Sequence, residues 1–195
     1  MNRKKAAYAL FLALVSITSI ASADVIGFDD IKYTNGDPAE IADGYQGFTW
    51  DNFWSARGTY NDELGRGLVS GGNVGFMISA STVSSFSNAT PFTFNAINIS
   101  KMYYNGLTHF DGYIGNTLAY SKDVFASRGV SSVANFDWTG LTRVDISVLD
   151  GSERPVFDDL TVNEQVSAVP EPMSISLFAA GLGLAGVASK RKKKA

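Results

Sequence analysis

The segment FDGYIGNTLAYSKDVF, residues 110–125, predicts two strands joined by a two-residue turn. Gly115-Asn116 places glycine first, as a type II′ turn requires, and the runs on either side are rich in residues that favour strands. Just upstream, Asn105-Gly106 interrupts the run from Lys101 to Phe110 and predicts a type I′ hairpin. The two turns together predict a three-stranded meander.

A later strand is marked by alternation of apolar and polar residues. Val144, Ile146 and Val148 alternate with Asp145 and Ser147, which predicts one buried face and one solvent-exposed face. Similar short runs recur about every eight to twelve residues, separated by Gly, Asn or Asp. The other predicted strands cover residues 25–32, 47–53, 67–70, 74–79, 92–99 and 156–163.

The middle of the chain therefore predicts an all-β fold. The pattern gives about nine or ten strands and no helix. Short strands spread evenly through one domain favour an antiparallel β-sandwich of jelly-roll type. A single closed barrel is the alternative that the same pattern allows.

The N-terminal end has the three parts of a secretory signal peptide. Basic residues at positions 3–5 precede an apolar run from Ala6 to Val15, and Ala21-Ser22-Ala23 provides an A-x-A cleavage site. Residues 1–23 are therefore predicted to be removed on export. The ectodomain is predicted to extend from residue 24 to residue 164.

The C-terminal end has the features of a membrane anchor. Residues 173–189 are apolar, and Lys190 opens a basic tail that runs to Lys194. A helix of that length spans roughly 25 Å at about 1.5 Å per residue, which is at the short end of what crosses a bilayer. Because basic residues stay on the cytoplasmic side, the ectodomain is predicted to lie outside.

A rigid polar element separates this anchor from a linker at residues 165–169. Pro170, Glu171 and Pro172 disfavour a helix and hold one carboxylate at the membrane surface. With the apolar span and the basic tail, they resemble the PEP-CTERM sorting signal of exopolysaccharide-producing Gram-negative bacteria, over residues 170–195. An ordinary anchor behind a proline-rich linker is the alternative.

The resemblance implies a partner and a location. An exosortase, an integral-membrane enzyme similar to Cys transpeptidases, would recognise Pro170, Glu171 and Pro172 as its substrate motif. The exported chain would first be tethered to the inner membrane. After processing it would reside in the cell envelope or the extracellular matrix of a Gram-negative bacterium.

The resemblance extends more weakly into the ectodomain. Residues 27–30 (GFDD), 44–53 (GYQGFTWDNF) and 157–162 (FDDLTV) are similar to segments of small β-sandwich ectodomains that PEP-CTERM proteins commonly carry. This similarity implies a sandwich in which the first and last strands pair. It transfers no site residue.

Composition narrows the possible partners of the ectodomain. Residues 24–168 hold eight Lys or Arg against eighteen Asp or Glu, a net charge of −10. Such a domain repels phosphate backbones, so we expect no nucleic-acid binding and keep neutral glycans and divalent cations as candidates. The chain has no cysteine, which excludes disulfides, thiolate metal sites and thiol catalysis.

Four acidic residues suggest a calcium site. Asp29 and Asp30 follow Phe28 near the mature N-terminus, and Asp158 and Asp159 follow Phe157 in the last predicted strand. By strand parity Asp158 points toward the apolar side, where an unpaired carboxylate is costly and a hard cation such as calcium would relieve the cost. The alternative is that all four are solvated acids at strand edges.

An aromatic region provides the candidate glycan-binding residues, Trp50, Trp54 and Tyr60, beside several amide and acid side chains. Flat rings next to such groups suit the faces and hydroxyls of sugars. Trp50 and Trp54 share strand parity, however, and a position in the core is the more common one for tryptophan.

Catalytic patterns are missing from the sequence. His109 is the single histidine, and no serine lies in a Gly-x-Ser-x-Gly elbow, so we do not expect an enzyme. The sequence thus predicts an exported protein that binds glycan or exopolysaccharide. The alternatives are a glycan-cleaving enzyme that uses paired carboxylates and a structural matrix protein without a ligand.

Overall fold

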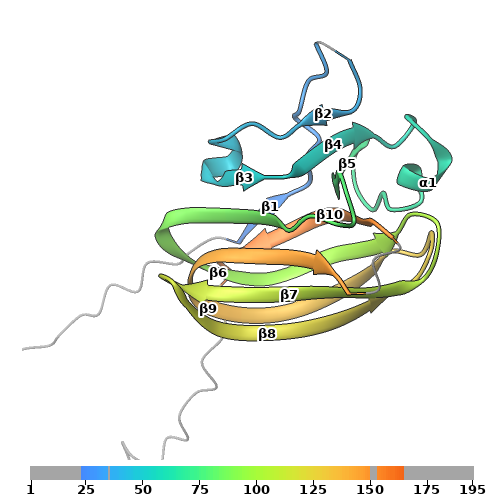
Figure 1. The fold of residues 1–195 in the computed structure, drawn as a ribbon. Helices are drawn as coiled ribbons and strands as arrows, with labels where there is room; N and C mark the ends of the chain where they lie inside the picture. The colour runs from blue at the N-terminus through green and yellow to red at the C-terminus, as the bar shows by residue number, and fades with distance from the viewer. Residues whose placement is uncertain (1–22, 35, 150–152, 165–195) are drawn as a thin grey trace, which may run out of the picture.

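The computed structural model describes residues 23–34, 36–149 and 153–164. They form ten strands with one short α-helix and one 3₁₀ turn (Figure 1). In chain order the elements are β1 (Asp24–Ile26), β2 (Ala39–Glu40), η1 (Tyr45–Gly47), β3 (Thr49–Asp51), β4 (Phe53–Arg57), α1 (Asp62–Gly65), β5 (Asn73–Met77), β6 (Ser84–Lys101), β7 (Gly106–Ile114), β8 (Thr117–Ala126), β9 (Ser132–Val148) and β10 (Pro155–Val162). The predicted linker and sorting signal, and the predicted signal peptide up to residue 22, lie outside the described residues.

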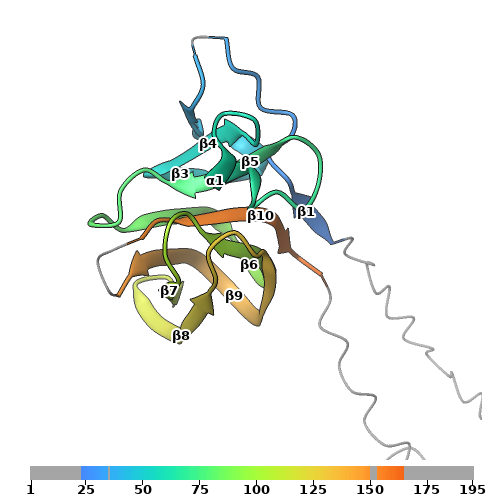
Figure 2. The ribbon, with the colours of Figure 1, turned by 90° about the vertical axis from the view of Figure 1, so that its right-hand side faces the viewer.

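Every pairing between these named strands is antiparallel. Hydrogen bonds connect them in the order β2-β4-β5-β10-β6-β9-β7-β8, while β1 pairs with β10 and β3 pairs with β6. Figures 1 and 2 show β3, β4 and β5 on one side of β10, and the long strands β9, β7 and β8 on the other. The antiparallel all-β prediction is confirmed. The jelly-roll type is not, because one continuous sheet links all the named strands.

The pairing of β1 with β10 places the two ends of the domain side by side. Asp24 lies opposite Val162 and Ile26 opposite Leu160. This is the pairing of first and last strands that the resemblance implied. The first strand is shorter than the predicted run of residues 25–32, since the chain turns at Phe28, which has a φ of +63°.

One of the two predicted hairpins is present. Ile114 pairs with Thr117 across Gly115-Asn116, and Gly115 has a φ of +59°, as the first position of a type II′ turn requires. The hairpin predicted at Asn105-Gly106 is wrong, because β7 pairs with β8 and β9 and not with β6. Neither residue has the positive φ of a type I′ turn.

The reason for the missing hairpin is that residues after β6 serve other contacts. Met102 is buried, with 2% of its surface exposed, in a small second core, and Asn105 Oδ1 accepts a hydrogen bond from the amide of Arg128 at 2.7 Å. These contacts lead the chain away from β6 before β7 begins.

Two further expectations fail locally. The expectation of no helix is wrong at α1, where Asn61 Oδ1 caps the helix by accepting from the amide of Leu64 at 2.9 Å. Residues 67–70 are irregular and not a strand, because the amides of Val69 and Ser70 bond to Asp158 instead of a neighbouring strand.

Two apolar clusters hold the sheet together. The larger is rich in rings, namely Phe28, Phe48, Trp50, Phe53, Phe86, Phe92, Phe94, Phe110, Phe136, Trp138 and Phe157. The smaller lies on the other side of β4, β5 and β10 and contains Ala56, Leu64, Val74, Phe76, Met102 and Val156. Strands β5 and β10 are therefore buried on both faces, and they fix the segments that carry the candidate sites.

Candidate functional site

Asp158 is completely buried on β10, and three backbone amides donate to its carboxylate. Its Oδ2 accepts from the amides of Val69 (2.7 Å) and Ser70 (2.9 Å), and its Oδ1 accepts from the amide of Asp159 (2.8 Å). Burial raises the pKa of Asp158, and the three amides oppose that rise. Asp158 thus fastens residues 69–70 to the central strand.

Asp29 and Asp159 lie close together beside Gly27. Asp29 Oδ1 accepts from the amides of Gly72 (2.6 Å) and Asn73 (3.0 Å), and Asp159 Oδ1 accepts from the hydroxyl of Ser70 (2.6 Å). A Cβ atom placed on Gly27 would be 3.2 Å from Asp29 Oδ2 and 3.4 Å from Asp159 Oδ1. The two Phe-Asp-Asp segments therefore meet at this point.

Asp30 is engaged elsewhere. Its two carboxylate oxygens accept from the Tyr45 hydroxyl at 2.6 Å and from Gln46 Nε2 at 3.2 Å. Burial and the hydrogen bond to Asp30 raise the pKa of Tyr45. Asp30 fixes the 3₁₀ turn η1 against the N-terminal segment.

Calcium binding stays a prediction, and fewer than the four predicted acidic residues are candidate ligands in the structure. Among residues 23–34, 36–149 and 153–164, no group of three or more His, Cys, Asp or Glu side chains is arranged to hold a metal ion. Asp158 is engaged by amides and Asp30 by Tyr45 and Gln46. A calcium ion would have to use Asp29 and Asp159 with backbone oxygens and water.

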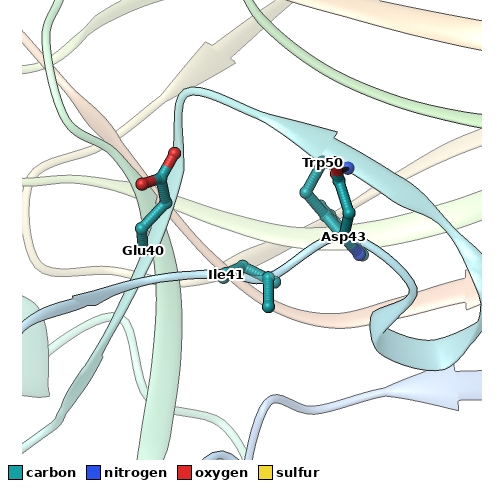
Figure 3. A pocket seen from close by; sticks show the side chains of 5 residues that line it. Glu40, Ile41, Asp43 and Trp50 are labelled. Atoms are coloured by element: carbon teal, nitrogen blue, oxygen red, sulfur yellow. Dashed lines mark hydrogen bonds between the residues drawn. The ribbon is translucent and has the colours of Figure 1, made fainter.

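Trp50 belongs to the core. It is 5% exposed, packs at ring-centroid distances of 5.2 to 6.2 Å against neighbouring aromatic rings, and donates from Nε1 to the carbonyl of Tyr45 at 2.9 Å. One edge borders a cavity of about 330 Å³, where Figure 3 shows Ile41 between Glu40 and the pair formed by Asp43 and Trp50. The ring is too enclosed to serve as a sugar platform.

Trp54 and Tyr60 lie outside the larger apolar cluster that contains Trp50. Asn52, with a φ of +57°, interrupts the strand between β3 and β4, so that Trp54 packs against the smaller cluster while Trp50 lies in the larger one. The shared strand parity of Trp50 and Trp54 therefore does not place the two rings on the same side of the sheet. Tyr60 is 49% exposed in the turn before α1, and of the three candidates it is the most exposed.

His109 is surrounded by polar groups on β7 and β8. Its Nδ1 lies 2.5 Å from Asp123 Oδ1, and its Nε2 lies 3.1 Å from Asp111 Oδ1 and 3.3 Å from Ser121 Oγ. The hydrogen bond to Asp123 and the charge of Asp111 raise the pKa of His109, while partial burial opposes the rise.

The connectivity from Ser121 through His109 to Asp123 has the order of a serine-hydrolase triad. A general base must have a free lone pair on Nε2 to take the serine proton. Because Asp111 also faces that nitrogen, the imidazole is favoured as a cation. The cluster is therefore an ion-pair network on the sheet surface.

A second cavity was not anticipated from the sequence. It has a volume of about 360 Å³ and is lined by Ile78, Ser79, Ala80, Tyr103, Glu153 and Arg154. The hairpin predicted from the sequence places Tyr103 in a strand, whereas in the structure it lies in the connection between β6 and β7. The adjacent pair Tyr103-Tyr104 is the sequence signal that could have indicated an exposed aromatic surface.

Within the described residues, no helix is long and apolar enough to cross a membrane. The predicted span at residues 173–189 and the motif residues Pro170, Glu171 and Pro172 lie outside them.

Two of the solved structures that match this chain are similar to it at low TM-scores. An agarase, AgWH50C, aligns with 69% of this chain and 26% of its own, at 6% identity and a TM-score of 0.41. The CBM22-1–GH10 modules of the Clostridium thermocellum endo-1,4-beta-D-xylanase 10B, complexed with xylohexaose, align with 70% of this chain and 29% of theirs, at 12% identity and a TM-score of 0.38. The chain thus spans less than a third of either protein, and neither score establishes a shared fold.

No curated protein matches the chain. The family model of the PEP-CTERM protein-sorting motif, in contrast, matches residues 168–192. These residues contain Pro170, Glu171 and Pro172 and the apolar stretch. That motif implies export, anchoring in the membrane before processing, and processing by an exosortase-like membrane enzyme. The chain thus carries a PEP-CTERM protein-sorting motif behind a β-rich domain.

Proposed function

We propose that this protein is an exported component of the cell envelope or extracellular matrix whose β-rich domain binds polysaccharide. The sorting motif at residues 168–192 is the observation that carries the proposal, because it delivers the domain to the outside of the cell. An exosortase-like enzyme processes the C-terminal signal there. The domain then functions where long glycan chains are the abundant macromolecules.

The surface chemistry of the domain supports a glycan as the ligand. A net charge of −10 over residues 24–168 disfavours binding of polyanionic nucleic acids, whereas it does not repel neutral polysaccharides. Among the described residues, tyrosine rings are exposed in two loops, at Tyr60 and at Tyr103-Tyr104. Rings of this kind supply flat apolar area with a hydroxyl at the edge, which suits sugars.

A glycan-cleaving enzyme is the second candidate. Asp111 and Asp145 lie opposite each other on β7 and β9, and burial raises the pKa of Asp145, which is the environment of an acid catalyst. Asp145 is paired with Arg143 at 2.8 Å, however, and neither acid lines either of the two cavities. Binding without cleavage is the better-supported function.

The proposal is tested by retention of the full-length chain, purified in detergent, on the exopolysaccharide of the producing organism. Parallel columns contain calcium or EDTA, and the eluted glycan is assayed for new reducing ends. Retention without new reducing ends is expected. No retention in either buffer would reject glycan binding, and new reducing ends that disappear in Asp145→Asn would favour the enzyme.

A further inference from the structure

Two connections meet at one end of the sheet, beside α1. Figure 1 shows the connection from β6 to β7, residues 102–105, and that from β8 to β9, residues 127–131, at the same end of the molecule. The amide of Lys101 donates to the carbonyl of Ser127 at 3.0 Å, and the amide of Gly129 donates to the carbonyl of Lys101 at 3.2 Å. These backbone bonds hold the two connections together.

Ionic and side-chain contacts connect the same end to helix α1. Arg128 donates from its amide to Asn105 Oδ1 at 2.7 Å and from its guanidinium to Glu63 of α1 at 2.6 Å. The bond to Glu63 raises the pKa of Arg128, and the nearby Tyr104 and Glu153 add to this effect. Helix α1, both connections and Glu153 thus form one unit.

Two neighbouring tyrosines are exposed on this unit. Tyr103 is 42% exposed and Tyr104 is 68% exposed, whereas Met102 directly before them is 2% exposed. The amide of Tyr103 donates to Glu153 Oε2 at 3.1 Å, and the amide of Met102 donates to the carbonyl of Arg154 at 3.2 Å. Because the backbone is fixed on both sides, the two rings are presented to solvent from a preorganised position.

The cavity of about 360 Å³ opens beside Tyr103 and is lined by both polar and aromatic side chains. Glu153 is 5% exposed, and the Arg154 guanidinium donates to the carbonyl of Ile78 at 3.1 Å. The cavity lies in the volume range of small-ligand sites, and it combines one ring with a carboxylate acceptor and a guanidinium donor. Such a combination fits a hydroxyl-rich ring of sugar size.

We infer that this end of the domain is the polysaccharide-binding site, in which the cavity beside Tyr103 holds one sugar unit and Tyr104 stacks on a neighbouring one. The inference rests on the proposed function and adds its location. Trp50 is buried in the core and Trp54 is packed on the smaller cluster, so neither supplies the platform. Charged groups that are already paired orient the site and leave the rings free to contact sugar.

Three single variants of the full-length chain test the inference by affinity for the producing organism's exopolysaccharide. Tyr103→Ala and Tyr104→Ala each remove one exposed ring, and Leu118→Ala is the control, because Leu118 is 51% exposed on β8 beside the Gly115-Asn116 turn, at the opposite end of the β7-β8 pair. Each of the first two is expected to weaken binding about threefold to tenfold, the range that one aromatic contact provides. The control is expected to bind as the wild type does.

The outcomes separate the inference from the proposed function. If the wild type does not bind, both fail. If the wild type binds and Tyr103→Ala and Tyr104→Ala bind equally well, the site is wrong while the function stands. Melting curves show whether a variant that binds glycan more weakly is also unfolded. If Tyr103→Ala is unfolded, the affinity of Tyr104→Ala tests the site, because the exposed Tyr104 ring contributes little to folding.

Discussion

Replacing Asp158 with asparagine tests the contact that fastens the loop at residues 69–70 to the central strand. The carboxylate accepts three backbone amides with two oxygens, at 2.7, 2.8 and 2.9 Å. Asparagine has nearly the same shape but only one acceptor oxygen. If that oxygen faces Val69 and Ser70, the amide group of the new side chain opposes the N–H of Asp159.

The expected cost follows from the count of lost bonds. Hydrogen bonds to a charged group contribute about 1.5 to 3 kcal/mol each, and neutral ones about 1 kcal/mol. One bond is lost and two are weakened, but the relief of a buried charge offsets part of the loss. We therefore expect Asp158→Asn to lower the free energy of unfolding by about 2 kcal/mol, and Asp158→Ala by about 3 to 4 kcal/mol.

Urea unfolding of residues 24–164, followed by tryptophan fluorescence at pH 7, measures the effect. The control is Asp159→Asn, since the asparagine oxygen can still accept from Ser70 and asparagine tolerates the φ of +43°. The control should lose less than about 0.5 kcal/mol. Equal midpoints for the wild type and Asp158→Asn would refute the reasoning.

Three other predictions concern the core, pH and calcium. Trp50→Ala should cost about 3 to 5 kcal/mol of stability, whereas Tyr60→Ala should change it by less than about 0.5 kcal/mol, as chemical denaturation measures. Because the pKa of His109 is raised in the folded state, its stabilisation is complete below the unfolded pKa of about 6.5 and is lost as pH rises through the folded pKa. Unfolding at pH 6 and pH 9 should show a loss of less than about 1 kcal/mol, which His109→Gln abolishes. If calcium binds, EDTA should lower the melting temperature by several degrees, corresponding to about 2.7 kcal/mol at a hundredfold excess over the Kd; unchanged melting would exclude it.

The sequence was informative where a local rule coincides with the fold. Gly115-Asn116 forms its turn because a glycine with positive φ is all that such a hairpin demands. The alternating residues Val144 and Ile146 are buried, as the period of two predicts. Both features depend on a few neighbouring residues.

The failures arise where distant parts of the chain compete with the local rule. Asn105-Gly106 has the composition of a hairpin turn, but Asn105 is used to bind Arg128 in another connection. Trp50 and Trp54 have the same parity in sequence, yet Asn52 adopts a positive φ and separates their strands. Nothing within a few residues reveals either event.

The candidate sites show the same division. Asp158 is buried, but strand parity did not decide this, because β10 is buried on both faces with Val156 in the smaller cluster and Leu160 in the larger one, and parity did not reveal that amides of residues 69–70 would donate to the carboxylate. The cavity of Tyr103, Glu153 and Arg154 joins residues about fifty positions apart and was not visible in any motif. The Pro-Glu-Pro motif needed no tertiary contact and was recognised directly.

The most direct test of the account is processing of the sorting signal in the producing bacterium. Wild-type protein and a variant with Pro170, Glu171 and Pro172 all replaced by alanine are followed by cell fractionation and by mass spectrometry of their C-terminal ends. We predict that the wild type loses its tail and leaves the membrane fraction, and that the variant retains the tail and stays there. Normal processing of the variant would contradict the central claim that this motif directs sorting.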